Sequence, residues 1–304
     1  MRGAQRTAYE KRPLMDSFIN LVTEPLAHEF MRDALLMSIL IAIVCSIFSC
    51  FLILKGWSLM GDAVSHAVLP GLALAFIAGI PLAIGAFIAG VFCALATGYL
   101  KENSRVKEDA VMGIVFSGMF AFGLVLLTRI ETDVHLLHVL FGNILGISKN
   151  DLIGAGIIAI LCSIVMLIKR KDFMLYCFDP AHARVIGLPV RALHFGLLIL
   201  LALTIVSSLK AAGIILVIAM LIAPGAIGLL LARSFDHMML ISLSASVFSC
   251  ITGTILSFYI DAATAPLIVV IQAGIFLFAL MARGYIKNMD NGFLGNERQA
   301  TEET

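Results

Sequence analysis

The amino-acid sequence predicts an all-α, polytopic integral membrane protein with eight or nine transmembrane helices in one membrane domain. Of the 304 residues, 61% are hydrophobic and only 13% are charged, and the mean hydropathy is +1.03. The chain also contains many apolar runs close to the ~20 residues that a helix needs to cross a bilayer. Alternating segments of about ten residues, typical of a membrane β-barrel, are absent from the sequence. The net charge of +1 gives no reason to expect nucleic-acid binding.

The apolar runs define the expected elements in order along the chain. We expect a polar, partly amphipathic extension over residues 1–32, the membrane domain over 33–285, and a polar cytoplasmic tail over 286–304. Pro81 divides one long run, because proline lacks the helical hydrogen-bond donor, and Lys210 marks a turn between two others. The expected spans cover residues 34–54, 63–100 in two parts, 110–128, 152–168, 192–209, 211–232, 238–260 and 262–282.

Basic residues predict the orientation of these spans, because short loops rich in lysine and arginine stay in the cytoplasm. Segment 169–191 carries five lysines and arginines against two aspartates. We therefore place this segment and 101–109 inside, and 129–149 with Asp261 outside. Nine spans then put the N-terminus outside and eight put it inside. The sequence leaves that parity open.

The segment 61–71, GDAVSHAVLPG, places the carboxylate of Asp62 and the imidazole of His66 four residues apart in an apolar run. On a helix these two side chains are neighbours. Ionisable groups at membrane depth usually face a bundle interior or a water-filled path, and this donor pair suits manganese, iron and zinc ions. The structural alternative is that Asp62 caps a helix and His66 packs against a neighbour. Pro70 and Gly71 imply an interruption, as found where transporter helices open near a site, which favours function.

A second feature lies in the cytoplasmic segment. Asp179 followed by Pro180 is typical of a helix N-cap and first helical residue, and Gly187 followed by Pro189 is typical of a helix end. We therefore expect a short, capped helix over residues 179–187. This helix is either an ordinary connection between two spans or a rigid contact surface on which a cytoplasmic partner acts.

The remaining polar candidates carry weaker signals. Asp133, His135 and His138 form an outer cluster that is either simply solvated or involved in ion entry. The six cysteines include no CxxC pair, and we interpret them as structural. The sequence contains no GxxxxGK[ST] phosphate loop. An ATP-driven process would therefore need its ATPase on another chain, and we do not expect this chain to be an enzyme.

Over roughly residues 30–285, the chain resembles the permease subunits of ATP-binding-cassette importers for manganese, iron or zinc. Segment 61–71 matches the family pattern GDAxSHAxLPG, and further matches are EDAVMGI at 108–114, HVLFGNIL at 138–145, and the stretch 212–224. The family pattern Pro-Thr-Gly after the outer aspartate is replaced here by AATAP after Asp261. The resemblance therefore assigns no role to Asp261.

The resemblance implies a type II ABC importer permease in the bacterial inner membrane. It implies transient metal ligands in the translocation path at Asp62 and His66, with His138 as a further candidate. It also implies that the path is shaped by Ser65, Pro70 and Gly71. Segment 179–187 would be the coupling helix that meets the ATPase through Asp179, Pro180, Ala183 and Gly187.

The resemblance also implies the partners. These are cytoplasmic ATP-binding subunits, a periplasmic or lipoprotein metal-binding protein, and a second permease chain in a homodimer or heterodimer. No cofactor would be bound permanently, because the metal ion is cargo and ATP lies on a partner chain. Alternative functions are a stand-alone secondary cation/proton transporter, an ABC permease for a metal chelate, or a structural membrane subunit. The sequence ranks neither the three metals nor the two kinds of dimer.

Overall fold

The computed structural model describes residues 23–128 and 144–302, and every regular element within these ranges is a helix. The elements are α2 (Glu29–Lys55), α3 (Met60–Ala67), α4 (Leu69–Ala78), α5 (Leu82–Asn103), α6 (Glu108–Leu127), η1 (Ile144–Gly146), α8 (Lys149–Ile168), α9 (Arg170–Phe178), α10 (Pro180–Val185), α11 (Val190–Leu231), α12 (Phe235–Ile260) and α13 (Thr264–Glu302).

Nine described segments are long and apolar enough to cross a membrane. They are Glu29–Lys55, Met60–Ala78, Leu82–Lys101, Ala110–Leu127, Lys149–Ile168, Val190–Leu209, Ala211–Leu231, Phe235–Ile260 and Thr264–Gly284. The all-helical, polytopic fold expected from the sequence is confirmed.

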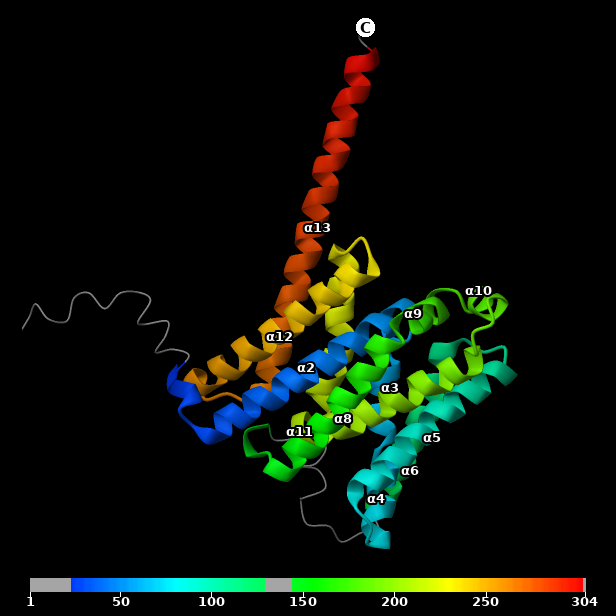
Figure 1. The fold of residues 1–304 in the computed structure, drawn as a ribbon, viewed down its shortest axis with the longest axis vertical. Coiled ribbons are helices and arrows are strands. Elements are labelled where there is room, and N and C mark those ends of the chain that lie inside the picture. The colour runs from blue at the N-terminus through cyan, green and yellow to red at the C-terminus, as the bar shows by residue number, and fades with distance from the viewer. Residues whose placement is uncertain (1–22, 129–143, 303–304) are drawn as a thin grey trace, which may run out of the picture.

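Helix α2 lies at the centre of the bundle and packs mainly against α11 and α12 (Figure 1). Its buried residues include the large Phe48 and Phe51 and the small Ser38, Ser46 and Ser49. Lipid tails are as apolar as the helix surfaces, so helices in a membrane associate through close packing and hydrogen bonds rather than through a hydrophobic force. The serines of α2 allow that close approach.

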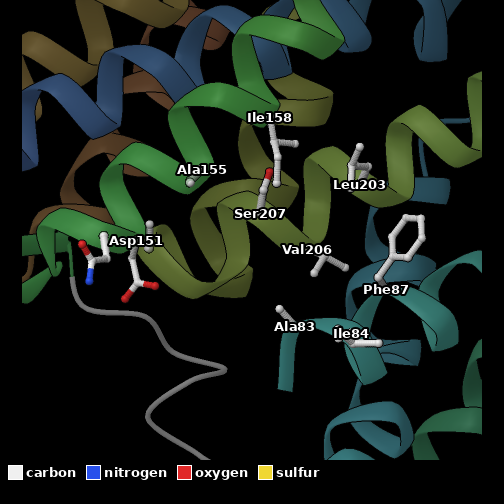
Figure 2. A pocket seen from close by; sticks show the side chains of 12 residues that line it. Ala83, Ile84, Phe87, Asp151, Ala155, Ile158, Leu203, Val206 and Ser207 are labelled. Carbon is white, nitrogen blue, oxygen red and sulfur yellow. The ribbon is translucent and has the colours of Figure 1, made fainter. Parts of the chain in front are cut away.

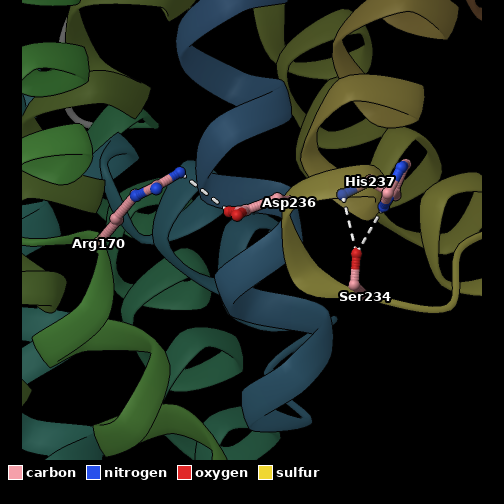
Figure 3. Close-up of polar contacts among 4 residues, drawn as sticks. All are labelled: Arg170, Ser234, Asp236 and His237. Carbon is pink, nitrogen blue, oxygen red and sulfur yellow. Dashed lines mark hydrogen bonds and ion pairs between the residues drawn. The ribbon is translucent and has the colours of Figure 1, made fainter.

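Polar contacts show which helix ends share one side of the bundle. At one end, Arg170 Nη1 lies 2.9 Å from Asp236 Oδ1 (Figure 3), and Lys55 Nζ lies 4.2 Å from the centre of the Tyr176 ring. At the opposite end, Lys149 at the start of α8 pairs with a glutamate at the start of α2. We call these the inner and outer ends, because the basic-residue rule places segment 169–191 in the cytoplasm. Helix α2 therefore runs from the outer end to the inner end.

Helix α11 contains two spans that fold back on each other. A straight helix of its 42 residues would be about 63 Å long, yet both of its ends lie at the inner end. Val190 follows α10 directly, and Leu231 precedes the turn whose Asp236 contacts Arg170. The backbone reverses at Gly213, where φ is 76° and ψ is 169°, a region that glycine enters at little steric cost.

With α11 counted as two spans, the nine spans cross the bundle alternately. Met60–Ala78 begins just after Lys55 at the inner end. Helix α5 finishes at the inner end, since Gly98 packs against His194 near the start of α11. Met60–Ala78 must therefore cross in full from the inner to the outer end. Of the two counts that the sequence left open, the part of the chain that the structure describes has nine, and the residues just before α2 then lie outside.

The last helix extends beyond the rest of the bundle (Figure 1). Helix α13 contains the final span, Thr264–Gly284, and continues as a helix to Glu302. Most of the expected tail over 286–304 is therefore helical. Because α13 starts at the outer end beside the end of α12, this extension projects on the inner side.

Candidate functional site

Asp62 and His66 lie one turn apart on the same face of α3. His66 Nε2 is 3.3 Å from Asp62 Oδ1, and their side chains are 31% and 34% exposed, respectively. The imidazole ring meets Phe120 of α6 edge to face, with 5.3 Å between ring centres. Phe116 of the same helix lies 6.2 Å away. The aromatic rings limit the orientation of the imidazole, and the pair presents one oxygen and one nitrogen donor side by side.

The rest of the segment is buried. Among residues 60–73, only Asp62 and His66 are not buried within the chain. Asp62 is the third residue of α3, and the N-cap position is held by Leu59 without a side-chain hydrogen bond. The capping alternative for Asp62 is therefore wrong. The alternative in which His66 packs against a neighbouring helix agrees with the contact between its ring and α6.

The three residues expected to shape a path lie inside the bundle. Ser65 is fully buried, and its hydroxyl donates to the Gly61 carbonyl at 2.7 Å. Pro70 and Gly71 are buried at the start of α4. A Cβ atom on Gly123 of α6 would lie 2.8 Å from the Pro70 nitrogen. These residues hold helices together in this chain, and α3 ends at Ala67, so the expected interruption is present.

The short helix over segment 179–187 forms as predicted. Asp179 Oδ1 accepts hydrogen bonds from the backbone N–H groups of Ala181 and His182 at 3.0 and 2.9 Å. Pro180 is the first residue of α10, and Gly187 follows its end with φ of 85°. Local sequence chemistry alone explains this helix, because all of these contacts lie within nine residues.

Exposed apolar side chains lie around α10, beside the exposed Asp179, His182 and Arg184. Ala183 is fully buried, whereas Phe178, Val185 and Ile186 are 79%, 83% and 55% exposed. They lie at the inner end, beyond the spans. An exposed apolar patch on a rigid, capped helix is typical of a protein-contact surface.

A cavity of 330 Å³ opens between α5, α8 and α11 at the outer end (Figure 2). Its wall is mostly apolar, with Asn150 and Asp151 near the start of α8 and Ser207 from α11 as polar members. Neither Asp62 nor His66 lines it. The cavity therefore does not contain the donor pair.

The other sequence candidates add no further donor to the site. His138, with Asp133 and His135, lies outside the described residues. Asp261 adopts the left-handed conformation that ends α12, with φ of 53°. In the described ranges no three histidine, cysteine or acidic side chains form a metal-sized group. All six cysteines are free and buried, as their structural interpretation predicted.

One cluster was missed by the sequence analysis. Lys55 ends the first span, and Trp57 lies in the turn after it. Tyr176 lies on α9 and His194 near the start of α11. These four side chains contact one another at the inner end. The sequence signal was faint: Trp57 is the single tryptophan of the chain. The three segments are far apart in the sequence, and only folding brings them together.

Within the described ranges, a helical bundle with nine candidate spans, an ionisable pair inside the second span and an exposed helix at the inner end is typical of a membrane transport subunit. The chain belongs to the ABC 3 transport family, whose model matches residues 27–283. It is a multi-pass protein of the inner membrane.

Named relatives and a solved structure agree with this family. The chain is 64% identical to the chelated iron transport system membrane protein YfeD of Yersinia pestis, over 88% of this chain and 90% of that one. It is 52% identical to the manganese transport system membrane protein MntB of Synechocystis, covering 87% and 86%. PsaBC from Streptococcus pneumoniae, solved with a Fab, matches with a TM-score of 0.73 and 35% identity over 87% of this chain and 95% of that chain.

Proposed function

We propose that this chain is the membrane-spanning subunit of an ATP-driven importer that moves manganese or iron ions into the cytoplasm. One observation carries the proposal: Asp62 and His66 are the only residues of 60–73 that are not buried. The chain thus turns a carboxylate and an imidazole outward from its own bundle, within the span Met60–Ala78. Such a donor pair suits first-row divalent ions, zinc included. The names of the relatives support iron and manganese.

The outward position of the pair implies a second permease chain. A charged side chain at the centre of a bilayer costs at least about 2.5 kcal/mol, so ionisable residues are normally turned away from lipid. A second chain packed over this face would shield Asp62 and His66 and add a second pair of donors. Four donors divided between two chains can release an ion more easily than a closed cage, as conduction requires. The translocation path would then run between the two chains.

Helix α10 is the proposed contact with the ATPase. Its N-cap makes it rigid, and its exposed apolar neighbours Phe178, Val185 and Ile186 offer a docking surface. Of the residues expected at this contact, Asp179, Pro180 and Gly187 shape the helix and Ala183 anchors it, because Ala183 is buried. A metal-binding protein would deliver the ion at the outer end.

Uptake of radioactive manganese, iron and zinc tests the proposal. Cells lacking their own high-affinity importers would express this chain with its ATPase and binding-protein partners. Asp62→Asn and His66→Gln keep side-chain shape but weaken metal binding, and each should lower uptake by about tenfold or more, because even outer-shell changes at metal sites cost that much. Asp261→Asn is the matched control, since asparagine tolerates the same left-handed backbone, and its uptake should equal wild type. Immunoblots of the membrane fraction would normalise each result.

A metal-chelate permease is the second candidate, favoured by the name of the relative YfeD, a chelated iron transport system membrane protein. Uptake that requires a chelator, and that Asp62→Asn leaves unchanged, would support the chelate and contradict the bare-ion path. A secondary transporter would ignore an inactive ATPase and stop with an uncoupler. Wild-type-like uptake in both Asp62→Asn and His66→Gln would contradict the role of the pair.

A further inference from the structure

Helix α9 ties α10 to the bundle through its buried face. Phe173, Tyr176 and Cys177 are only 4%, 3% and 5% exposed. Tyr176 lies three residues before Asp179, the N-cap of α10. Asp179 both ends α9 and caps α10. Because this single residue joins the two helices, a displacement of α10 also displaces the Tyr176 side chain.

Tyr176 is held at two points. Its hydroxyl and His194 Nδ1 are hydrogen-bonded at 2.7 Å, and Lys55 Nζ lies 4.2 Å from the centre of its ring. His194 belongs to the first turns of α11, and Lys55 is the last residue of α2. The phenol of Tyr176 thus contacts both long elements of the bundle core at once.

The His194 ring has little freedom to move independently of its neighbours. It meets the Trp57 ring edge to face at 5.3 Å between centres. On another side, α5 approaches so closely that a Cβ atom on Gly98 would lie 2.8 Å from His194 Nε2. Close-packed side chains transmit displacement because few voids can absorb it. A push on Tyr176 is therefore passed through His194 to Trp57.

The backbone of Trp57 is hydrogen-bonded to the end of α2 and to the start of α3. Trp57 is 3% exposed. Its backbone N–H donates to the Leu52 carbonyl at 2.8 Å, and its backbone carbonyl accepts from the Met60 N–H at 3.1 Å. Met60 is the first residue of α3, and Asp62 follows two residues later. The α2–α3 turn is compact, with Gly56 in the left-handed region at φ of 77°. A displacement of Trp57 that reaches its backbone therefore moves the start of the helix that carries Asp62 and His66.

We infer that Tyr176, His194 and Trp57 form a linkage that transmits movement of α10 to the Asp62–His66 pair. The linkage rests on the proposed function, in which α10 receives the ATPase movement. Its members are positioning residues, since none of them contacts the ion. Without the linkage, ATP hydrolysis continues but moves fewer ions.

The test compares metal transported per ATP hydrolysed, in proteoliposomes that hold the whole importer. Tyr176→Phe removes only the hydroxyl that bonds His194 and keeps the ring beneath Lys55. It should lower the ratio of manganese to ATP about fivefold, within the range of measured couplings between sites, while the ATPase rate stays near wild type. His194→Asn should have the same effect, and the double variant should be no worse than either single one. Tyr99→Phe on α5, a 66% exposed tyrosine, is the matched control and should leave the ratio unchanged.

A spectroscopic arm follows Trp57 directly. Because Trp57 is the single tryptophan, permease made with fluorotryptophan and assembled with unlabelled partners gives one fluorine resonance. ATP should shift that resonance in the wild type and leave it unmoved in Tyr176→Phe. Three outcomes would overturn the linkage. They are a wild-type resonance that ATP does not shift, a Tyr176→Phe ratio of manganese to ATP equal to wild type, and an equal loss of transport and ATPase activity in Tyr176→Phe. A wild-type importer that moves no metal would instead overturn the proposed function, so the two failures are distinguishable.

Discussion

Gly71 of α4 and Gly85 of α5 face each other at backbone contact distance. A Cβ atom added to Gly71 would lie 2.1 Å from the Gly85 carbonyl oxygen, and one added to Gly85 would lie 2.2 Å from the Gly71 oxygen. No side chain fits between the two helices at this level. The outer half of Met60–Ala78 is thereby fastened to α5, and the half that carries Asp62 and His66 packs against α5, α6 and α11.

Alanine at either glycine should therefore destabilise the protein. Gly71→Ala and Gly85→Ala each push a methyl group against backbone, and overpacking of this kind typically costs about 1–3 kcal/mol or more. Thermal unfolding in detergent, followed by size-exclusion fluorescence, would measure the loss. Gly118→Ala on α6 is the control, because a Cβ atom there meets nothing within 4 Å. An equal melting temperature for Gly71→Ala and Gly118→Ala would contradict the close contact.

Ser49 of α2 is hydrogen-bonded to the α11 backbone on both sides of Pro224. Its hydroxyl accepts the Gly225 N–H at 2.8 Å and donates to the Ile222 carbonyl at 3.2 Å. Ser49→Ala leaves a buried N–H without that acceptor, at a cost of about 1–3 kcal/mol. The same unfolding assay should show a lower melting temperature for Ser49→Ala than for Ser244→Ala. Ser244 is an exposed serine of α12 that bonds only within its own helix.

The Asp179 cap should control the stability of α10 without affecting the spans. Asp179→Ala removes the Oδ1 atom that accepts both capping hydrogen bonds and should cost about 0.5–2 kcal/mol of local stability. Hydrogen exchange should show faster exchange of the Ala181 and His182 amides, with the spans unchanged. Asp179→Asn retains a capping oxygen and should restore most of the protection. Equal protection in wild type and Asp179→Ala would show that tertiary packing alone holds α10.

Cys177 should resist alkylation in the folded protein. Burial raises the pKa of its thiol from 9.0 to about 12, with nearby Lys55 opposing the shift. At pH 8 the thiolate fraction is then about a thousandfold lower than in the unfolded chain, and the thiolate is the reacting form. Peptide mapping after iodoacetamide treatment should find Cys177 modified only after denaturation.

The same shift predicts a pH dependence of stability. A raised folded pKa means that the folded state holds its proton more tightly. The contribution of Cys177 is therefore fully present below pH 9 and is lost as pH rises toward about 12. Cys177→Ala should lose less stability than wild type between these pH values, and an identical alkaline decline would contradict the assignment.

The short-range features were predictable from the sequence because their causes are local. The thickness of a bilayer sets the length of an apolar run, so the spans could be located from hydropathy. The α10 helix could be located because its cap, first proline and final glycine lie within nine residues. The turn in α11 was misplaced by three residues, at Lys210 instead of Gly213. A charge suggested the turn, but the backbone reverses where glycine permits a positive φ.

The sequence by itself thus determined the class, the spans and the presence of Asp62 and His66 as donors one helical turn apart. Only the tertiary structure decided that Met60–Ala78 crosses in full, and that Asp62 and His66 stay partly exposed while Ser65, Pro70 and Gly71 are buried. It also decided that Lys55, Trp57, Tyr176 and His194 meet at the inner end. The physical reason is that burial and packing depend on residues distant in sequence. Apolar helices have similar surfaces on all sides, so packing against neighbouring helices decides which face of each is buried.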